Sequence, residues 1–231
     1  YYKKKWGFCL SENEKYNLPT GKFKVFINST LKKGKLNLAE AKLKGKVKRE
    51  IFISTNICHP SMANNELSGP VLLSALIKYV RDNYKKSYYS YRFLFTPETI
   101  GSLAYLSKNH INMKKRIIAG FTLSCVGDER NYSHVASPNY NLADQALESA
   151  LIGLKNVKAY SFLERGSDER QYCSPNIELP VCGFCRSKYG KYPEYHTSKD
   201  NFDVMTKKGL QGSFNVMKNI IDAFEIGLFP K

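Results

Sequence analysis

The chain has 231 residues, of which 42% are hydrophobic and 24% charged, and it carries a formal net charge of +16. This composition is typical of a globular protein with one large domain or two small ones, and it excludes low-complexity and fibrous chains. No apolar run is long enough to cross a bilayer, so we expect no membrane segment.

The positive charge is concentrated in residues 1–50, which hold 14 Lys/Arg and 4 Asp/Glu, a net +10. Such a segment can bind nucleic acid or an anionic glycan, but here lysine dominates and no nucleic-acid motif is present. Lysines on the solvent-facing side of strands and turns explain the excess better, so nucleic acid is not an expected partner.

The six cysteines lie mostly in apolar runs, and a chain of this length needs no disulfides for stability. We therefore expect reduced thiols and a cytoplasmic location. The sequence begins at Tyr1 without a methionine or an apolar signal segment, which indicates no targeting segment and suggests a fragment of a longer protein.

Residues 1–46 differ in pattern from the rest of the chain. The stretch "KFKVFINSTLKKGKLNLAEAKLKGK" alternates apolar and polar residues between short glycine turns, which predicts small antiparallel strands over 22–44. We expect these strands to pack beside the main sheet and not to continue it.

From residue 47 onward, short apolar strands alternate with amphipathic helices. The expected strands are 51–57, 91–96, 116–127 and 179–187, and the expected helices are 70–84, 100–109, 141–154 and 206–226. Continuous apolar strands separated by helices predict an α/β fold over 47–231, with a mostly parallel central sheet and helices on both faces.

Polar residues gather where these strands end, and ligands of such sheets bind beyond the carboxyl ends of the strands. His59, Glu98 and Cys125 each end or follow a different predicted strand, and so does Arg186, which precedes the loop "YGKYPEYHTSKDN". Side chains from four separate loops are therefore expected to meet at one edge of the sheet.

Two histidines, His59 and His196, lie in strand-end loops and are candidate metal ligands, whereas His110 ends a surface helix and His134 lies in a polar loop. The nearby candidate carboxylates are Glu66, Asp128, Asp168, Glu169 and Glu194. No compact motif such as HExxH is present, so a metal site must be assembled from distant segments. The lone "CGFC" at 182–185 lies in a predicted strand and lacks the second cysteine pair that a zinc site would need.

Glu98 follows Pro97 at a strand end and precedes a helix that starts near Ile100. One interpretation is a carboxylate that stabilises the helix N-terminus. The other is a general base that takes a proton from a metal-bound water.

Four motifs in this order are specific: "ICHPSMANNELSG", "TPETIGSLAYL", "GSDERQYCSP" and "RSKYGKYPEYHTSKDNFD". From about Trp6 to the C-terminus, they resemble a bacterial family of aminopeptidase-like proteins, often found near surface-polysaccharide genes. This family is a divergent branch of the zinc exopeptidases related to bacterial leucyl aminopeptidases. The resemblance implies a mixed central sheet with helices on both faces, and it implies that residues 1–46 are part of a small inserted β domain in a longer protein.

The resemblance carries over position by position. His59 and His196 match the two histidine ligands of the two-zinc relatives, and Glu98 matches their general base. Three ligand carboxylates are replaced: Asn65, next to Glu66, stands at the bridging aspartate, Thr99 at the glutamate after the base, and Cys125 at the remaining aspartate.

The resemblance thus implies one zinc ion in preference to two, held by His59 and His196 with Glu66 or another carboxylate. Asn65, Asp168 and Glu169 are candidates for binding the substrate, Arg186 for pairing with a substrate carboxylate, and Tyr195 for lining the pocket.

The leading hypothesis is a zinc-dependent exopeptidase or amidohydrolase that acts on a small or peptide-like amide, with Glu98 as base. Two alternatives stay open. One is a binding protein on a peptidase scaffold that has lost catalysis, and the other is a module that binds nucleic acid or glycan through the basic first 50 residues.

Overall fold

The computed structural model describes residues 7–30 and 32–227. The chain divides into two units, Tyr1–Lys35 and Leu36–Lys231. In the first unit the described residues form one short helix, α1 (Glu12–Tyr16), which begins with a capping box between Ser11 and Glu14. None of the described residues of this unit is buried, so it contains no hydrophobic core of its own.

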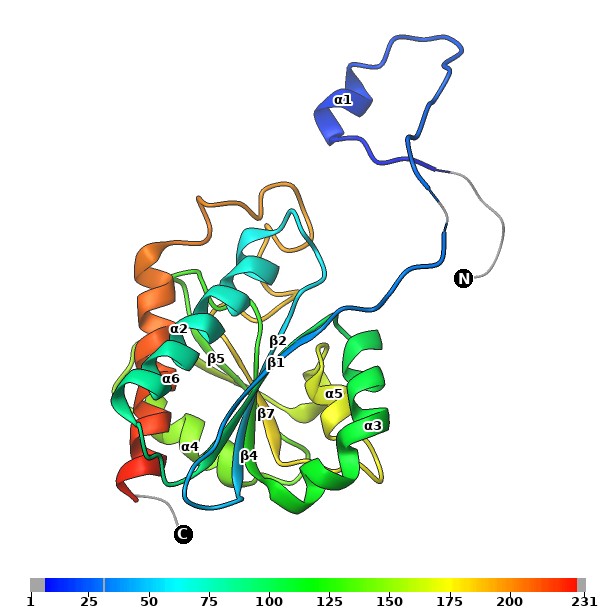
Figure 1. The fold of residues 1–231 in the computed structure, drawn as a ribbon. Coiled ribbons are helices and arrows are strands. Elements are labelled where there is room, and N and C mark those ends of the chain that lie inside the picture. Colours follow the sequence, from blue (N-terminus) through cyan, green and yellow to red (C-terminus); the bar gives the residue numbers. More distant parts are fainter. Residues whose placement is uncertain (1–6, 31, 228–231) are drawn as a thin grey trace. The chain divides into compact units, whose positions relative to one another are not determined.

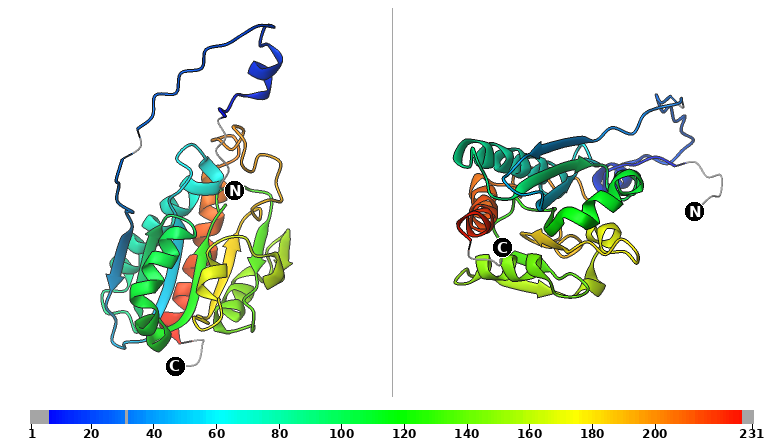
Figure 2. Two further views of the ribbon diagram at one scale, coloured as in Figure 1. Left: turned by 90° about the vertical axis from the view of Figure 1, so that its right-hand side faces the viewer. Right: turned by 60° about the horizontal axis from the view of Figure 1, so that its bottom comes forward.

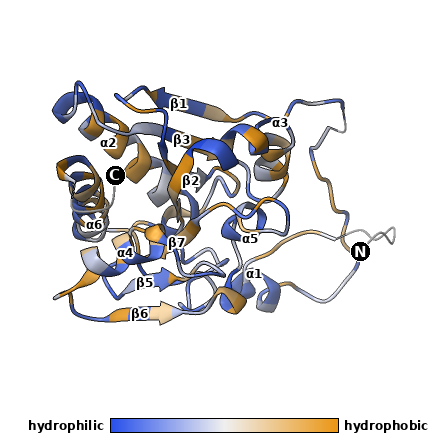
Figure 3. Cartoon of the chain, turned by 90° about the horizontal axis from the view of Figure 1, so that it is seen from below, coloured by the Kyte–Doolittle hydropathy of each residue, from blue (hydrophilic) through white to orange (hydrophobic). Residues whose placement is uncertain are grey.

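The second unit is built on a sheet of seven strands in the order β1-β3-β2-β4-β7-β5-β6. Its strands are β1 (Ala39–Leu43), β2 (Glu50–Asn56), β3 (Ser90–Thr96), β4 (Ile117–Leu123), β5 (Tyr132–Val135), β6 (Val157–Tyr160) and β7 (Val181–Cys185). Four neighbouring pairs run parallel, and the pairs β1–β3 and β5–β7 run antiparallel. The predicted mostly parallel sheet is confirmed, and Figure 3 labels β1, β3, β2, β7, β5 and β6 in this order from top to bottom.

Helices cover both faces of this sheet, as predicted. The long ones are α2 (Ser68–Asn83), α3 (Ile100–Arg116), α4 (Leu142–Leu151) and α6 (Lys207–Ile226), and the short ones are η1 (Ala63–Leu67), η2 (Phe162–Glu164) and α5 (Glu169–Tyr172). Figures 1 and 2 show α2, α4 and α6 on one face and α3 with α5 on the other. No helix within the described part of the chain has the length and apolarity needed to span a membrane.

Each face has its own hydrophobic core. The larger core lies under α2, α4 and α6 and is centred on inward-facing strand residues such as Ile51, Phe93 and Phe121. The smaller core lies under α3 and α5 and includes Phe52 and Tyr172, whose rings meet edge to face with centroids 5.0 Å apart. Neighbouring residues of β2 therefore pack into opposite cores, as period-two alternation requires.

The first 50 residues differ from the prediction. Among residues 22–30 and 32–38 no strand forms, and β1 continues the main sheet as its edge strand and does not lie beside it. Backbone pairing explains why only the last part of this region forms a strand. The backbone of β1 pairs with β3 while Ala41 and Leu43 pack on the larger core, whereas residues 22–30 and 32–38 are exposed. The division after Lys35 also falls earlier than the boundary expected at residue 46.

Candidate functional site

The strand-end residues come together at one edge of the sheet. The loop after β2 carries His59 and leads into η1, which carries Glu66, while Glu98 and His196 lie in the loops that follow β3 and β7. Since β2, β3 and β7 all run in one direction, their carboxyl ends share an edge, as the sequence predicted.

His59 and Glu66 form the centre of this site. His59 Nδ1 lies 3.0 Å from Glu66 Oε1, and the backbone N–H of Cys58 donates to Glu66 Oε2 at 2.9 Å. The Glu66 side chain is only 6% exposed and that of His59 is 39% exposed. The carboxylate is therefore fixed in place, while the imidazole remains open to a ligand from solvent.

His196 adds a second imidazole. Its ring centroid lies 4.9 Å from that of His59, and its other face stacks on Tyr195 at 3.9 Å. Partial burial and the neighbouring His59 lower the pKa of His196, which favours the neutral form that a metal ligand needs. The stacking explains how Tyr195 lines the site.

Asp200 ties the His196 loop to η1. Its carboxylate accepts the backbone N–H groups of Asn64 at 2.6 Å and Asn65 at 3.1 Å, and the Tyr192 hydroxyl at 2.9 Å. Asp200 was not among the predicted site residues, although the pattern "HTSKD" ends on it.

Two residues at replaced ligand positions also lie here. Asn65 Oδ1 is buried without a hydrogen-bond partner, and its Nδ2 is 3.9 Å from Cys125 Sγ. Burial raises the pKa of Cys125 to about 12, so the thiol is protonated at neutral pH. An unpartnered acceptor inside a polar cluster indicates a place for a donor or a cation.

Glu98 is partly buried beside other carboxylates. Burial raises its pKa above the ordinary value, as do the nearby Glu66 and Glu169, while a hydrogen bond from Ser167 lowers it. The Ser167 hydroxyl in turn accepts from Asn56 Nδ2 at 3.0 Å. The end of β2 thus positions the carboxylate of Glu98 through Ser167.

Asp168 faces the start of α3. Its Oδ1 accepts the Thr99 N–H at 2.8 Å and the Ser102 hydroxyl at 2.9 Å, while Oδ2 is buried without a partner. Burial raises its pKa to about 7. These contacts make Asp168 a support of the Glu98 turn.

Glu169 and Arg186 are engaged in structural contacts. Glu169 accepts hydrogen bonds from two backbone N–H groups and from Tyr189 and Thr122. Arg186 is 4% exposed, stacks 3.7 Å over the Tyr132 ring and donates to backbone carbonyls. The Arg186 guanidinium is thus buried and donates from two of its nitrogens within the protein, and its pairing with a substrate carboxylate stays a prediction.

An apolar groove of about 320 Å³ adjoins His59 and Glu66. It is lined by Ile57, Cys58, Pro60, Met62, Leu67 and Pro70. A larger groove of about 540 Å³ lies between α2 and the start of α6, but none of the candidate catalytic residues lines it. The smaller groove is the one that bears on the chemistry.

The donor set of the site suits zinc, because two imidazoles and a carboxylate are common zinc ligands and the buried Asn65 Oδ1 lacks a partner. The donor atoms of these side chains are spread more widely than ligands around one ion. Within the described residues, the one set of three donors that all lie within 4.8 Å of one another is His134, Asp144 and Cys182, elsewhere in the fold.

Comparison with known proteins gives relatives for this arrangement. A family described as a domain of unknown function (DUF4910) matches residues 12–227. A protein of Clostridium acetobutylicum, assigned provisionally to polysaccharide biosynthesis and named for an aminopeptidase-like domain, is 40% identical over 228 residues. That match covers 97% of this chain and 51% of the relative, so the chain spans about half the length of the relative.

Solved structures agree. The crystal structure of a provisionally assigned peptidase from Clostridium acetobutylicum superposes with a TM-score of 0.91 at 38% identity, covering 97% of this chain and 53% of that one. The zinc aminopeptidase of Bacillus subtilis gives a TM-score of 0.66 at 17% identity, over 81% of this chain and 48% of its own, which is a likeness of fold. The chain therefore belongs to the DUF4910 family, and its α/β unit has the fold of the bacterial zinc aminopeptidases.

Proposed function

We propose that this chain carries the active site of a zinc-dependent amide hydrolase of the exopeptidase type. The observation that carries the proposal is the pair of imidazoles with ring centroids 4.9 Å apart, one of them hydrogen-bonded to the buried Glu66. His59, Glu66 and His196 would hold one zinc ion, which when bound supplies a Lewis acid for the amide carbonyl and for water.

Glu98 is the proposed general base. The pKa of Glu98 is raised toward neutral pH, and a base with such a pKa can both accept and return a proton. Ser167 and Asn56 hold the carboxylate from one side, and Asp168 holds the following turn through the Thr99 N–H. These residues need to fix one carboxylate only, so the replacement of the neighbouring ligand by Thr99 leaves the role of Glu98 intact.

The proposed substrate is a small or peptide-like amide with an apolar group. The groove beside His59 and Glu66 has apolar walls and an open mouth, which suits an aliphatic side chain or a short acyl group. The provisional role of the relative in polysaccharide biosynthesis adds N-acyl sugars to the substrates worth testing.

The test uses the purified chain, its zinc content and a panel of aminoacyl and N-acyl sugar amides. Glu98→Gln should keep the fold and the zinc but lose about a hundredfold to ten-thousandfold in turnover. His59→Ala should lose the zinc of this site together with activity. The matched control is Glu129→Gln, a carboxylate bonded to Thr206 and Lys208. Undiminished turnover in Glu98→Gln would exclude Glu98 as the base.

A second candidate function rests on the three replaced ligand positions. Asn65 and Cys125 lie side by side where the resemblance expects carboxylates, and Thr99 follows the base. A site with these replacements could bind an amide ligand without cleaving it. Binding of an amide from the panel without turnover, in a chain that retains zinc, would favour this function over hydrolysis.

A further inference from the structure

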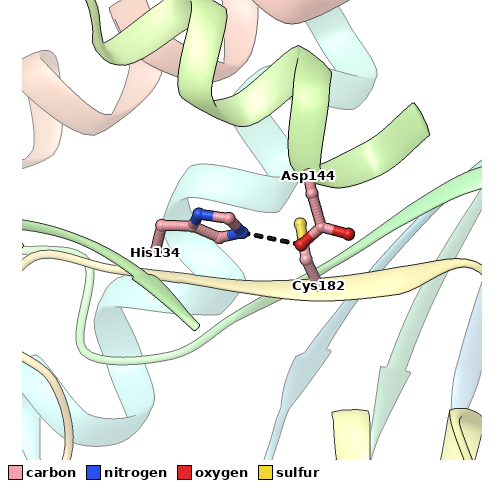
Figure 4. A group of neighbouring side chains, drawn as sticks. All are labelled: His134, Asp144 and Cys182. Carbon is pink, nitrogen blue, oxygen red and sulfur yellow. Dashed lines mark hydrogen bonds and ion pairs between the residues drawn. The ribbon is translucent and has the colours of Figure 1, made fainter. Parts of the chain in front are cut away.

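A second group of ligand-type side chains lies away from the strand-end site, under α4. His134 comes from β5, Asp144 from the first turn of α4 and Cys182 from β7, and Figure 4 shows the three side chains facing one another. One donor atom from each lies within 4.8 Å of the others. His134 is 2% exposed and the other two are fully buried.

The two nitrogens of His134 both face carboxylates. Nε2 lies 2.8 Å from Asp144 Oδ1, and Nδ1 lies 3.4 Å from Glu148 Oε1. A neutral imidazole carries one N–H, so it can donate to only one of them. The other nitrogen would then direct its lone pair at a carboxylate oxygen, which is repulsive unless a proton or a metal ion lies between them.

The surroundings match those of a bound ion. Metal-ligating histidines usually donate their other N–H to a carboxylate, and Glu148 is placed to accept it. Asp144 is held by the Ser137 N–H and hydroxyl and by the Asn141 N–H. This second layer of contacts fixes the direction of the carboxylate toward the ring.

A partial entry path is present as well. A surface pocket of about 300 Å³ is lined by His134, Glu148, Leu151 and Val157, together with neighbouring apolar residues. The pocket brings solvent to the Glu148 side of the imidazole, whereas Asp144 and Cys182 do not line it, so a local opening beside the ring is needed for an ion to reach them.

We propose that His134, Asp144 and Cys182 form a buried zinc site that joins β5, α4 and β7, separate from the strand-end site. A thiolate, an imidazole and a carboxylate are all zinc ligands, and a water would take the fourth tetrahedral position. Binding replaces the thiol proton of Cys182 by the ion and releases that proton to solvent. The ion would link three elements of the fold.

The experiment uses the full chain stripped with a chelator and reloaded with cobalt(II), a spectroscopic substitute for zinc. A cobalt–thiolate bond gives a charge-transfer absorption in the near ultraviolet, which imidazole and carboxylate ligands do not. The parent should show this band. Cys182→Ala should abolish it, and Cys185→Ala, the buried cysteine that belongs to a different cluster of the same strand, should keep it.

A variant at a surface position tests the proposed site without changing the core, so its result does not depend on whether a core variant folds. Glu148 has a side chain that is 47% exposed, so Glu148→Gln should fold normally, retain the band and bind cobalt about 10–100-fold more weakly. His59→Ala should leave the band unchanged, which separates this site from the proposed catalytic one. A parent without the band, or a band that survives Cys182→Ala, overturns the proposal and leaves His134 and Asp144 as a proton-bridged pair.

Discussion

Thr99, Cys125 and His196 all adopt a positive φ, at 62°, 53° and 56° respectively. Three residues with side chains at the strand-end site therefore occupy a backbone region that L-residues rarely adopt, and Thr99 is β-branched, for which such a φ is a true outlier. Strain of this kind costs roughly 1–3 kcal/mol and concentrates at functional sites. The positive φ values at this edge of the sheet therefore lower the stability of the fold while they hold the side chains in position.

Thr99→Gly should raise the thermal midpoint of unfolding, because glycine adopts a positive φ without strain, and a gain of about 1 kcal/mol is expected. The paired control is Thr206→Gly at the start of α6, where φ is −118° and the threonine caps Gly209. That change should lower the midpoint. If both changes lowered it, the strain at Thr99 would be refuted.

Asp168 should make stability depend on pH. Its pKa is raised from 3.8 to about 7 by burial, so the folded state holds a proton that the unfolded state has released. Its contribution is complete below the unfolded pKa of 3.8 and is lost as pH rises through about 7. A shift of this size corresponds to at most about 4 kcal/mol.

The measurement is the urea midpoint across that window. Asp168→Asn removes the titration, so the parent should lose more stability than the variant as the pH rises from about 4 to about 8. Equal slopes for the two proteins would show that Asp168 does not titrate in this range. Glu98, whose pKa is also raised, acts in the same direction and is present in both proteins.

At the scale of elements, a buried ion pair joins β2, β3 and α3. Arg92 is 1% exposed, and its Nε donates to Glu50 Oε2 at 2.6 Å. Its remaining donors reach the Tyr105 hydroxyl at 2.8 Å and Asn112 Oδ1 at 2.9 Å, both on α3. Each of the three guanidinium nitrogens therefore donates a hydrogen bond.

Glu50→Ala should destabilise the fold by about 3–5 kcal/mol, because it leaves a buried guanidinium without its carboxylate. The comparison is Asp82→Ala, which breaks an exposed ion pair with Lys78 on α2 and should cost about 0.5 kcal/mol or less. Chemical denaturation of both variants checks the ratio. Similar losses would mean that the Glu50–Arg92 pair adds little.

The strands β2, β3, β4 and β7 were predictable because each is a continuous apolar run between turn signals. The strands β5 and β6 were not, because each has four residues and too few positions to show a period. His134 was accordingly placed in a polar loop, although it lies buried in β5. The sequence also could not show that Arg186 stacks on Tyr132, since that contact depends on the antiparallel pairing of β5 with β7, in which Ser133 lies opposite Cys185.

Within the site, the convergence of the loops followed from the parallel sheet, and the two histidines followed from their place in strand-end loops and from the resemblance. The spatial proximity of Asp200 and η1 did not, because it joins residues 64 and 200 through backbone N–H groups that carry no sequence signal.

At the scale of the molecule, the two units contribute differently to stability. The buried residues described all belong to the unit Leu36–Lys231, whereas residues 7–30 and 32–35 are exposed. A chain that starts at residue 36 should therefore unfold cooperatively at nearly the temperature of the parent.

A chain that starts at residue 45 lacks β1 and should be less stable, because Glu40 and the backbone partner of β3 are gone. Calorimetry of the two shortened chains measures both effects. A large loss of stability in the first would show that residues 1–35 support the sheet.

The order of the strands also bears on how the protein is made. β7 separates β4 from β5, although β5 and β6 precede it in sequence. On a ribosome, the growing chain would complete the β1-β3-β2-β4 half first, and the β5–β6 pair would have no place on it until residue 185 had emerged. Through that interval the free edge of β4 would be open to other nascent chains, which makes the synthesis of residues 124–185 the stage most exposed to aggregation and to chaperone capture.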